Sequence, residues 1–480
     1  MTTAIEFLDI RTVEHTHFLE RRVTPVRRYA QNPILPDAND IATVLKGKDG
    51  VIRMWYKTKT PIPGIPPHGG RIVIGVYSLR YAESTDGLTW TFPNLNLKEV
   101  NGSKANNVVL KYVSTMGPVP PEFRKPDLDS AGNPVNADCI LDRELTPMPH
   151  TRGRFTALSH KGTSFAFSDD GFTWTAYPEN PVLSLGGSDT YNNFVFDPKI
   201  NRYVLFHRPH PNIHAGWARV NRLVARIESD DLVNWDWSSA RCVLDTDSRD
   251  TPAVHPKGDK QRGRLKQFYG MNVVRHGDLF LGLAQLLDDS RGGWFDVHLV
   301  TSLDGIDWRR ELPDQPLVPL PGRGHWDSGM VWAKPPIAMG DDLYIYYTGS
   351  SISHQYQMMN DTKLDKRQIG LGIVRRGRLV GYHAGEADGE LLTRPFVLTG
   401  PQLFLNASAT DGEIRIAVAQ GDGKPIPGLG KDDFRPISDD GLRLPMVWRE
   451  PEQLAKLVGQ KIRLRISVRA GAIYGFQAGA

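Results

Sequence analysis

The chain has very little cysteine: Cys139 and Cys242 are the two cysteines among 480 residues. Two cysteines make no disulfide framework, and their spacing is not that of a zinc site, so we expect no metal and no cofactor. No apolar run approaches the roughly 18 residues of a membrane span, so no membrane contact is expected. The first residues lack a basic and then apolar segment, which predicts a cytoplasmic protein without a signal peptide.

An excess of one charge is missing too, because 58 Lys and Arg stand against 54 Asp and Glu. The basic residues form no long block, so nucleic acid is not expected as a partner. Glycine and proline are abundant instead, at 46 and 35 residues, and 11 Trp, 15 Tyr and 18 Phe are spread along the chain. This composition is typical of a globular fold with many turns.

A short phrase, Ser-x-Asp-Gly-x-x-Trp, recurs along the sequence. It occupies residues 84–90, 168–174, 229–235 (with Leu232 in place of Gly) and 302–308. Ser and Asp close turns through side-chain-to-backbone hydrogen bonds, and Gly takes up a left-handed conformation. We therefore predict that these aspartates are structural and that Trp90, Trp174, Trp235 and Trp308 pack between sheets.

Apolar runs of strand length precede the phrases in units of about 70 residues. The clearest runs are 40–45 and 51–56, 193–196 and 202–206, 269–274 and 279–283, and 329–332, 343–347 and 369–374. The second unit is expected to start at 106–110 and to be stretched by a polar insertion before 154–158. Five four-stranded meanders arranged radially make a five-bladed β-propeller, an all-β fold, over roughly residues 30–388.

The composition changes near Thr393, and the remaining segment is rich in alternating strands. Residues 461–469 place Ile462, Leu464, Ile466 and Val468 on one face and mostly basic residues on the other. Alternation with a period of two predicts a strand with one buried face. We expect two domains, a propeller with an N-terminal lead-in at 1–388 and a β-sandwich at 389–480. The basic row is read as a solvated face, with contact to an anionic glycan as the alternative.

Topology then separates the two faces of the expected propeller. The starts of the innermost strands and the loops between second and third strands share one face. That face should hold Asp40, Asn107, Asn193, Tyr269 and Asp327. Its rim should consist of the long loops 57–70, 207–222, 287–294 and 348–368. Long loops on one face of a rigid scaffold are the usual place for a binding site.

The opening Asn32-Pro-Ile-Leu and the motifs 268–271, 326–329 and 393–396 carry a resemblance to a known group. With the repeats, the chain resembles the five-bladed propeller glycoside hydrolases of families 32, 43 and 68, and above all the family-32-like bacterial members. The resemblance implies a glycosidase that acts on a glycoside or oligosaccharide, with furanosides among the candidates. It leaves the sugar, the linkage and the stereochemical outcome open.

The resemblance also implies three catalytic acids. Asp40 matches the first by its position, and Asp189 lies in the neighbourhood of the second. Gln267 stands where an acid was sought, so Asp327 and Asp288 become candidates for the proton donor. Such chemistry needs one protonated and one ionised carboxyl group on opposite sides of the sugar. We therefore take Asp40, Asp189 and Asp327 as the catalytic set.

The expected substrate contacts are polar and aromatic residues near the same face. They are Asn107, Asn193, His207, Arg208, His210, Gln267, Tyr269, Asp288, Arg291 and Trp326. Three histidines lie between 207 and 214, but prolines interrupt them and Arg208 would oppose a cation, so they indicate sugar recognition rather than a metal.

Two other functions fit the same scaffold. The missing glutamate and the absent hydrolase motifs are compatible with a glycan-binding propeller that has lost catalysis. A glycoside phosphorylase or a polysaccharide lyase would use the basic rim for phosphate or for a uronate. Turnover on a panel of glycosides separates these possibilities, because a binding module gives affinity without product.

Overall fold

The computed structural model describes residues 4–61, 74–100, 102–115, 137–159, 163–183, 191–209, 222–250, 266–354 and 367–479. Their regular secondary structure is almost entirely β-strand, as predicted. The helical elements with described bounds are α2 (Pro451–Ala455), η1 (Ile10–Thr12), η4 (Ser248–Asp250) and η5 (Asp289–Arg291). Within the described part of the chain, no helix is long and apolar enough to cross a membrane.

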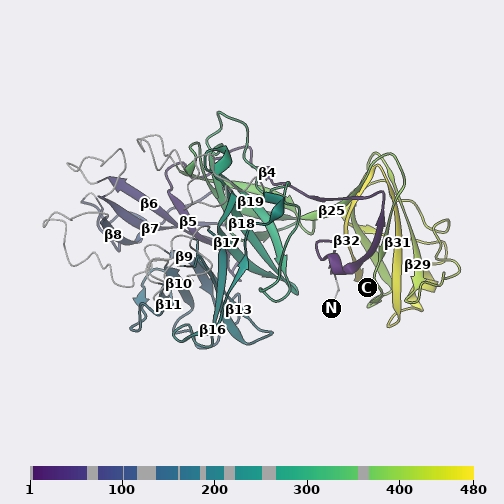
Figure 1. Cartoon of the computed structure of the whole chain (residues 1–480), viewed down its shortest axis with the longest axis horizontal. Coiled ribbons are helices and arrows are strands. Elements are labelled where there is room, and N and C mark those ends of the chain that lie inside the picture. Colours follow the sequence, from purple (N-terminus) through teal and green to yellow (C-terminus); the bar gives the residue numbers. More distant parts are fainter. Residues whose placement is uncertain are drawn as a thin grey trace. The chain divides into compact units, whose positions relative to one another are not determined.

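The chain divides into two compact units. The large unit comprises Val26–Met339 and Tyr344–Ile373, and the small unit comprises the residues up to Pro25, Gly340–Leu343 and the residues from Val374 onwards. We expected a boundary at 388 and 389, with the N-terminal lead-in beside the propeller. The N-terminal segment instead belongs to the small unit, where its purple strand pairs with later strands in Figure 1.

Three separate four-stranded antiparallel sheets follow one another in the large unit. Sheet 1 contains β5 (Asp40–Lys46), β6 (Ile52–Pro61), β7 (Ile74–Ser84) and β8 (Val108–Thr115). Sheet 2 contains β9 (Ala137–Asp142), β10 (Phe155–Ser159), β11 (Ser164–Ser168) and β12 (Thr175–Ala176). Sheet 3 contains β13 (Asn193–Asp197), β14 (Arg202–His207), β15 (Val224–Ser229) and β16 (Trp235–Leu244).

Two further groups of strands share one larger sheet. Group 4 contains β17 (Lys266–His276), β18 (Leu279–Asp288), β19 (Trp294–Ser302) and β20 (Trp308–Arg310). Group 5 contains β21 (Met330–Ala333), β22 (Ile337–Met339), β23 (Asp342–Ser350), β24 (Gln368–Arg375) and β4 (Arg27–Arg28). A parallel pairing of Phe295 with Met330 joins the groups. The early strand β4 pairs with β24, so the start of the large unit is held by its end.

Hydrophobic side chains connect the sheets in a cyclic order. One cluster joins Trp55 of sheet 1 to Phe155 of sheet 2. Others join Phe165 of sheet 2 to Phe194 of sheet 3, and Phe206 of sheet 3 to Phe280 of group 4. A further cluster joins Tyr346 of group 5 back to Ile52 of sheet 1. Since groups 4 and 5 share a sheet, every neighbouring pair in the cycle is in contact.

The repeated phrases form the turns that were predicted. In the second phrase, Gly171 N donates to Ser168 Oγ at 2.9 Å, and Phe172 N donates to Asp170 Oδ1 at 2.7 Å. Gly171 has a φ of +80°, and a Cβ there would lie 2.7 Å from the Trp55 ring, so glycine suits both the turn and the packing. The phrase aspartates thus cap turns, which confirms their structural interpretation.

The tryptophans of the phrases pack in the clusters between sheets, also as predicted. Trp90, Trp174 and Trp235 are buried, and Trp308 is half-buried against Phe206 of sheet 3. Trp174, Trp235 and Trp308 each donate their indole N–H to a carbonyl three residues earlier.

One strand assignment was wrong. Residues 106–110 were expected to open the second unit, but β8 is the fourth strand of sheet 1 and pairs with β7. Sheet 2 begins with β9 (Ala137–Asp142), which lies inside the expected polar insertion. The turn phrase at 84–90 is followed by a connection of 17 residues before β8. After a long connection, the sheet to which the next strand belongs cannot be predicted from its sequence, because strand pairing is not local.

Two sheets form the small unit. The first contains β3 (Glu20–Val23), β25 (Val380–Ala384), β32 (Gly471–Gly479), β28 (Gln402–Ser408), β30 (Asp440–Pro445) and β1 (Ala4–Glu6). The second contains β2 (Val13–His17), β26 (Gly389–Thr393), β31 (Lys461–Arg469), β27 (Phe396–Val397) and β29 (Glu413–Gln420).

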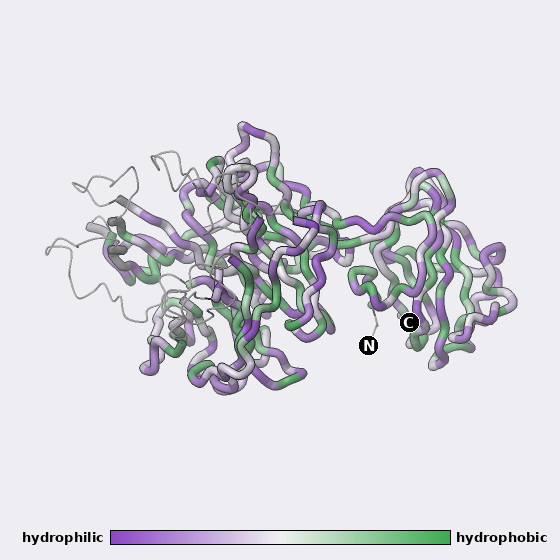
Figure 2. Tube along the Cα trace, in the orientation of Figure 1, coloured by the Kyte–Doolittle hydropathy of each residue, from purple (hydrophilic) through white to green (hydrophobic). Residues whose placement is uncertain are grey.

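One hydrophobic cluster contains side chains from both of these sheets, among them Ile466 of β31 and Phe476 of β32. The four apolar residues of β31 are buried, as the alternation predicted. Hydrophobic green and hydrophilic purple segments alternate along the chain in Figure 2, in keeping with strands that bury one face.

We predict that replacing Trp235 with Ala lowers the free energy of unfolding by about 3–5 kcal/mol, because a large buried side chain is lost. Trp237, two residues along β16, is the matched control: 47% of its surface is exposed, against 8% for Trp235. Its replacement with Ala should change stability by about 0.5 kcal/mol or less. Urea titrations followed by far-ultraviolet circular dichroism measure both, and equal losses would contradict the packing described.

Candidate active site

The first strands of the five groups meet around a common cavity of about 180 Å³. Its lining includes Ala42 of β5, Cys139 of β9, Val195 of β13, Val273 of β17 and Lys334, which follows β21. This convergence of first strands was predicted from the repeats. Polar side chains at the axis are therefore brought together from segments that are far apart in sequence.

Hydrogen bonds link each first strand to the next around this cavity. Thr43 Oγ1 donates to Ile140 O at 3.2 Å, and Asn193 Nδ2 donates to Cys139 Sγ at 3.3 Å. Val273 N donates to Asn193 Oδ1, and Asn272 Nδ2 donates to Ala333 O. The next link runs from Trp332 Nε1 to Asp40 Oδ1 at 2.8 Å. The cycle of strands is thus held together by polar contacts as well as by apolar packing.

Asp40 begins β5 and is buried, with 4% of its surface exposed. Its Oδ1 accepts from its neighbour's backbone, Ile41 N, at 2.8 Å and from Trp332 Nε1 at 2.8 Å. Its Oδ2 lies 2.8 Å from the ammonium of Lys57, on the neighbouring strand β6. The carboxylate is held rigidly by donors from two groups of the fold.

Lys57 lies between two carboxylates. Its Nζ is also 3.7 Å from Oδ1 of Asp138, a buried residue of β9. Asp138 Oδ2 accepts from Asn192 N at 3.2 Å, and its backbone carbonyl accepts from Lys334 Nζ at 2.8 Å. Two carboxylates and two ammonium groups form one buried cluster, which we call the axial ion cluster.

The pKa values within the axial ion cluster follow from burial and from these neighbours. Burial opposes ionisation of Asp40, but Lys57, Lys334 and the hydrogen bonds hold the pKa of Asp40 below its ordinary value. Burial likewise opposes charge on Lys57, yet Asp40 and Asp138 raise the pKa of Lys57. For Lys334 burial dominates and lowers the pKa of its ammonium. Asp40 is therefore ionised at neutral pH.

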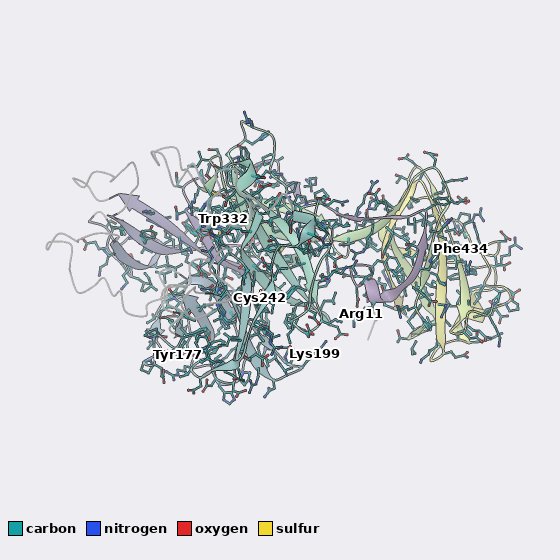
Figure 3. All side chains as sticks on the ribbon, in the orientation of Figure 1. Arg11, Tyr177, Lys199, Cys242, Trp332 and Phe434 are labelled. Carbon is teal, nitrogen blue, oxygen red and sulfur yellow. The ribbon has the colours of Figure 1, made fainter. Side chains whose placement is uncertain are left out.

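Aromatic rings extend from this cluster. The Trp332 ring lies 5.8 Å from that of Tyr191, which lies 6.1 Å from that of Tyr269. Figure 3 labels Trp332 among the strands of the large unit. Burial, and then the charge of Asp40, raises the pKa of Tyr191 well above its ordinary value. Tyr191 therefore stays neutral beside Asp40.

Several expected substrate contacts lie together beyond these rings. The guanidinium of Arg208 lies 4.3 Å from the centre of the Tyr269 ring and donates to Tyr269 O at 2.8 Å. Arg222 also lies over this ring and donates to Gln267 Oε1. Gln267 in turn donates to Asp289 Oδ2 at 3.1 Å. The expected grouping of Arg208, Gln267 and Tyr269 is present, and the rings connect it to Asp40.

Asp327 is buried in a polar environment of its own. Its Oδ2 accepts from Arg28 Nε at 2.8 Å and from Tyr347 OH at 2.9 Å. Thr348, the residue after Tyr347 on β23, points to Asp40 instead. Successive side chains of a strand point to opposite sides of its sheet, so the two carboxylates contact opposite sides of β23. Asp327 precedes the inner strand β21 as Asp40 begins β5, and a catalytic role for Asp327 stays a prediction.

Asn107 and Asn193 have structural surroundings. Asn107 lies before the outer strand β8, rather than on an inner strand, and donates to Tyr56 OH and to Tyr81 O. The expectation that it starts an inner strand was wrong for the reason given for β8. Asn193 does begin an inner strand, but its side chain links sheet 2 to group 4, as described above.

The remaining expected contacts are distributed around the unit. Asp288 caps η5 by accepting from Ser290 N at 3.0 Å, and the backbone of Arg291 ends η5. Trp326 stacks on Tyr347 at 5.8 Å, and His207 is buried with Nδ1 3.1 Å from Arg208 O. Asp189 and His210 lie outside the described residues.

Asp138, Lys57, Trp332 and Lys334 were not among the expected site residues. The sequence carries a signal for Asp138: it precedes Cys139-Ile140-Leu141, just as Asp40 precedes an apolar run. Lys57 and Trp332 carry no such signal, because their position depends on which strands pair. Among the described residues, no three His, Cys, Asp or Glu side chains form a group that could hold a metal ion.

No family model and no curated protein matches the chain. It is similar to a solved RGII complex of BT0996, with a TM-score of 0.44, 14% identity and coverage of 74% of this chain and 92% of that one. It is also similar to a glycosyl hydrolase from Bacteroides ovatus, with a TM-score of 0.42, 12% identity and coverage of 74% of this chain and 95% of that one. A third similar structure is the catalytic domain of the Coprinopsis cinerea GH62 alpha-L-arabinofuranosidase. Its TM-score is 0.39 at 14% identity, and the match covers 74% of this chain and 96% of that one.

We predict that replacing Lys57 with Met destabilises the protein by about 3–5 kcal/mol at pH 7, because it leaves Asp40 and Asp138 buried without their shared cation. In the native protein the pKa of Asp40 is lowered, so its stabilising contribution is present above the ordinary carboxyl pKa and is lost as pH falls through the folded value. In the variant, burial without Lys57 favours protonation, so the deficit should shrink from pH 7 to pH 5.

Urea titrations at the two pH values test this. The double variant Lys57→Met with Asp40→Asn serves as a control, and it should recover part of the loss at pH 7. A deficit that does not depend on pH would show that Lys57 contributes packing rather than charge.

Proposed function

We propose that this chain is a glycoside hydrolase, built as a five-bladed β-propeller followed by a β-sandwich, with Asp40 as its ionised catalytic carboxylate. The cyclic order of the hydrophobic clusters and the single cavity between five first strands support the propeller. The shared core of the two sheets in the small unit supports the sandwich. The glycoside hydrolase names among the similar solved structures agree with this class.

The observation that carries the proposal is the state of Asp40. It lies at the start of an inner strand, and its pKa is lowered by Lys57 and Lys334 despite burial. Glycoside hydrolysis breaks the bond from the anomeric carbon to the leaving oxygen, which takes up a proton, and the oxygen of water joins that carbon. An ionised carboxylate acts in this step as the nucleophile or as the base that activates water.

Three neighbours hold Asp40 in this state and act as positioning residues. Lys57 and Trp332 fix its two oxygens, and Asp138 shares the charge of Lys57. For the second catalytic carboxyl group we retain Asp189. Tyr191, two residues beyond it in sequence, packs against Trp332. Arg208, Gln267 and Tyr269 are proposed to contact the sugar.

A second function is favoured by one specific observation. Both oxygens of Asp40 already accept from protein donors, and the residue is almost fully buried. A nucleophile needs access to its substrate, so these contacts also fit a propeller that binds a glycan and has lost catalysis. In that case the axial ion cluster is structural, and sugar binds without being cleaved.

We predict that Asp40→Asn lowers kcat at least a thousandfold, which corresponds to about 4 kcal/mol of barrier. The substitution also removes the ion pair with Lys57, so stability should fall and turnover must be referred to the folded fraction. Asp327→Asn is the matched control: it breaks the ion pair between buried Asp327 and partly exposed Arg28, on the Tyr347 side of β23. It should lower the melting temperature without a comparable loss of kcat.

The measurement is turnover on a panel of aryl glycosides and oligosaccharides, with the folded fraction determined by circular dichroism. Near-normal kcat in Asp40→Asn would remove Asp40 from the reaction. Binding of a panel member to the wild-type protein, without product from any of them, would support the glycan-binding alternative.

A further inference from the structure

A second cavity of the large unit opens beside Asp40. Its volume is about 480 Å³, and its lining includes Asp37, Asn39, Thr58, Lys59, Arg80 and Arg367. Asn39 immediately precedes Asp40 and donates its backbone N–H to Lys57 O at 2.7 Å. The cavity therefore adjoins the Asp40 and Lys57 pair, which lies at the start of β5 and in the middle of β6.

Arg80 is fixed in the wall of this cavity by neutral groups. Its Nε donates to Thr58 Oγ1 at 3.0 Å, and its Nη1 donates to Asn107 Oδ1 at 3.0 Å. Asn107 is buried and is oriented by Tyr56 OH and Tyr81 O. Neither acceptor carries a charge, and among the described residues no carboxylate lies within ion-pair distance of Arg80. The guanidinium is held in one orientation, and no described residue compensates its charge.

The other charged side chains of the cavity are mostly cationic as well. The Lys59 ammonium lies 5.0 Å from the centre of the Tyr77 ring. The Arg367 guanidinium lies 5.0 Å from the centre of the Trp332 ring, whose indole N–H bonds Asp40. Asp37 is the one acid in the described lining, so three cations face one carboxylate.

The arrangement of cations in this cavity favours one chemical class of ligand. A fixed guanidinium presents paired N–H donors that match the two oxygens of a carboxylate or phosphate. Lysine adds charge without fixing the orientation of its partner. Neutral sugar hydroxyls do not need an excess of cations, and folding does not need uncompensated charge in a solvent-filled cavity. The cavity is suited to an oxyanion.

We infer that this cavity binds an oxyanion next to the reacting centre, with Arg80 as its principal ligand. The oxyanion is either the carboxylate of a uronic acid residue in the glycan or inorganic phosphate that takes part in the reaction. The inference rests on the proposed function only in naming a glycan as the bearer of the carboxylate.

Binding of three probes to the full chain, measured by isothermal titration calorimetry, tests this inference. The probes are sodium glucuronate, glucose as its neutral counterpart, and sodium phosphate. We expect glucuronate or phosphate to bind at least tenfold more tightly than glucose, with an affinity that falls as salt is raised. Preference for glucuronate identifies a uronate, and preference for phosphate identifies the reactant anion.

Variants that remove a positive or a negative charge from the cavity provide a second test. Arg80→Gln should weaken binding of the preferred anion at least tenfold, whereas Arg80→Lys should retain part of it. Asp37→Asn removes the one acid of the described lining and should tighten anion binding several-fold. Arg53→Gln is the matched control, because Arg53 lies on the neighbouring strand β6 and is paired with Asp49 outside the cavity. It should leave the affinity unchanged.

The results separate this inference from the proposed function. Equal affinity for glucuronate, phosphate and glucose, or anion binding that Arg80→Gln leaves intact, overturns the oxyanion site even if Asp40→Asn abolishes hydrolysis. Conversely, Arg80-dependent anion binding supports the site even if Asp40→Asn retains turnover, an outcome that contradicts only the catalytic role of Asp40.

Discussion

The ammonium of Lys57, buried between Asp40 and Asp138, is the interaction on which the centre of the large unit depends. A buried charge is tolerated only where partners compensate it, so each member fixes the position of the others. Asp40 and Lys57 come from sheet 1 and Asp138 from sheet 2. Lys334, after β21, bonds the carbonyl of Asp138. Charged contacts thus fix the positions of sheet 1, sheet 2 and group 5 relative to one another. Hydrogen bonds between the other first strands complete the cycle of contacts around the central cavity.

Local chemistry made much of this fold predictable. The repeated Ser-x-Asp-Gly-x-x-Trp phrase specifies its turn through its own side chains, so four turns could be located without knowing any partner strand. The alternation in 461–469 likewise needs only one buried face. Placement of the N-terminal segment could not be predicted, because β1 and β3 pair with β32 and β25, which lie hundreds of residues away. Sheet partners chosen at such separation leave no local pattern.

The site residues also differ in whether local sequence or strand pairing determines their position. Asp40 was predicted because it precedes an apolar inner strand. Asp138 occupies the equivalent position and was missed because a long connection displaced the expected start of sheet 2. The partner of Asp327 was not predictable, since it depends on a single step along β23, where Tyr347 bonds Asp327 and Thr348 bonds Asp40. Sequence position indicates that a carboxylate is near the axis, and strand register decides what it meets.

Charge balance distinguishes the two polar regions near Asp40. The axial ion cluster contains two carboxylates and two ammonium groups, so it is compensated from within and can be buried without a ligand. The cavity around Arg80 is open to solvent, and its described lining contains three cations and one acid. The Arg80 guanidinium is held in place by two neutral acceptors, and no carboxylate among the described residues pairs with it. The axial ion cluster therefore stabilises the fold by itself, whereas we infer that the Arg80 cavity binds an anion from solution. The two regions adjoin at Asn39 and Lys57, so that anion would bind within reach of the ionised Asp40.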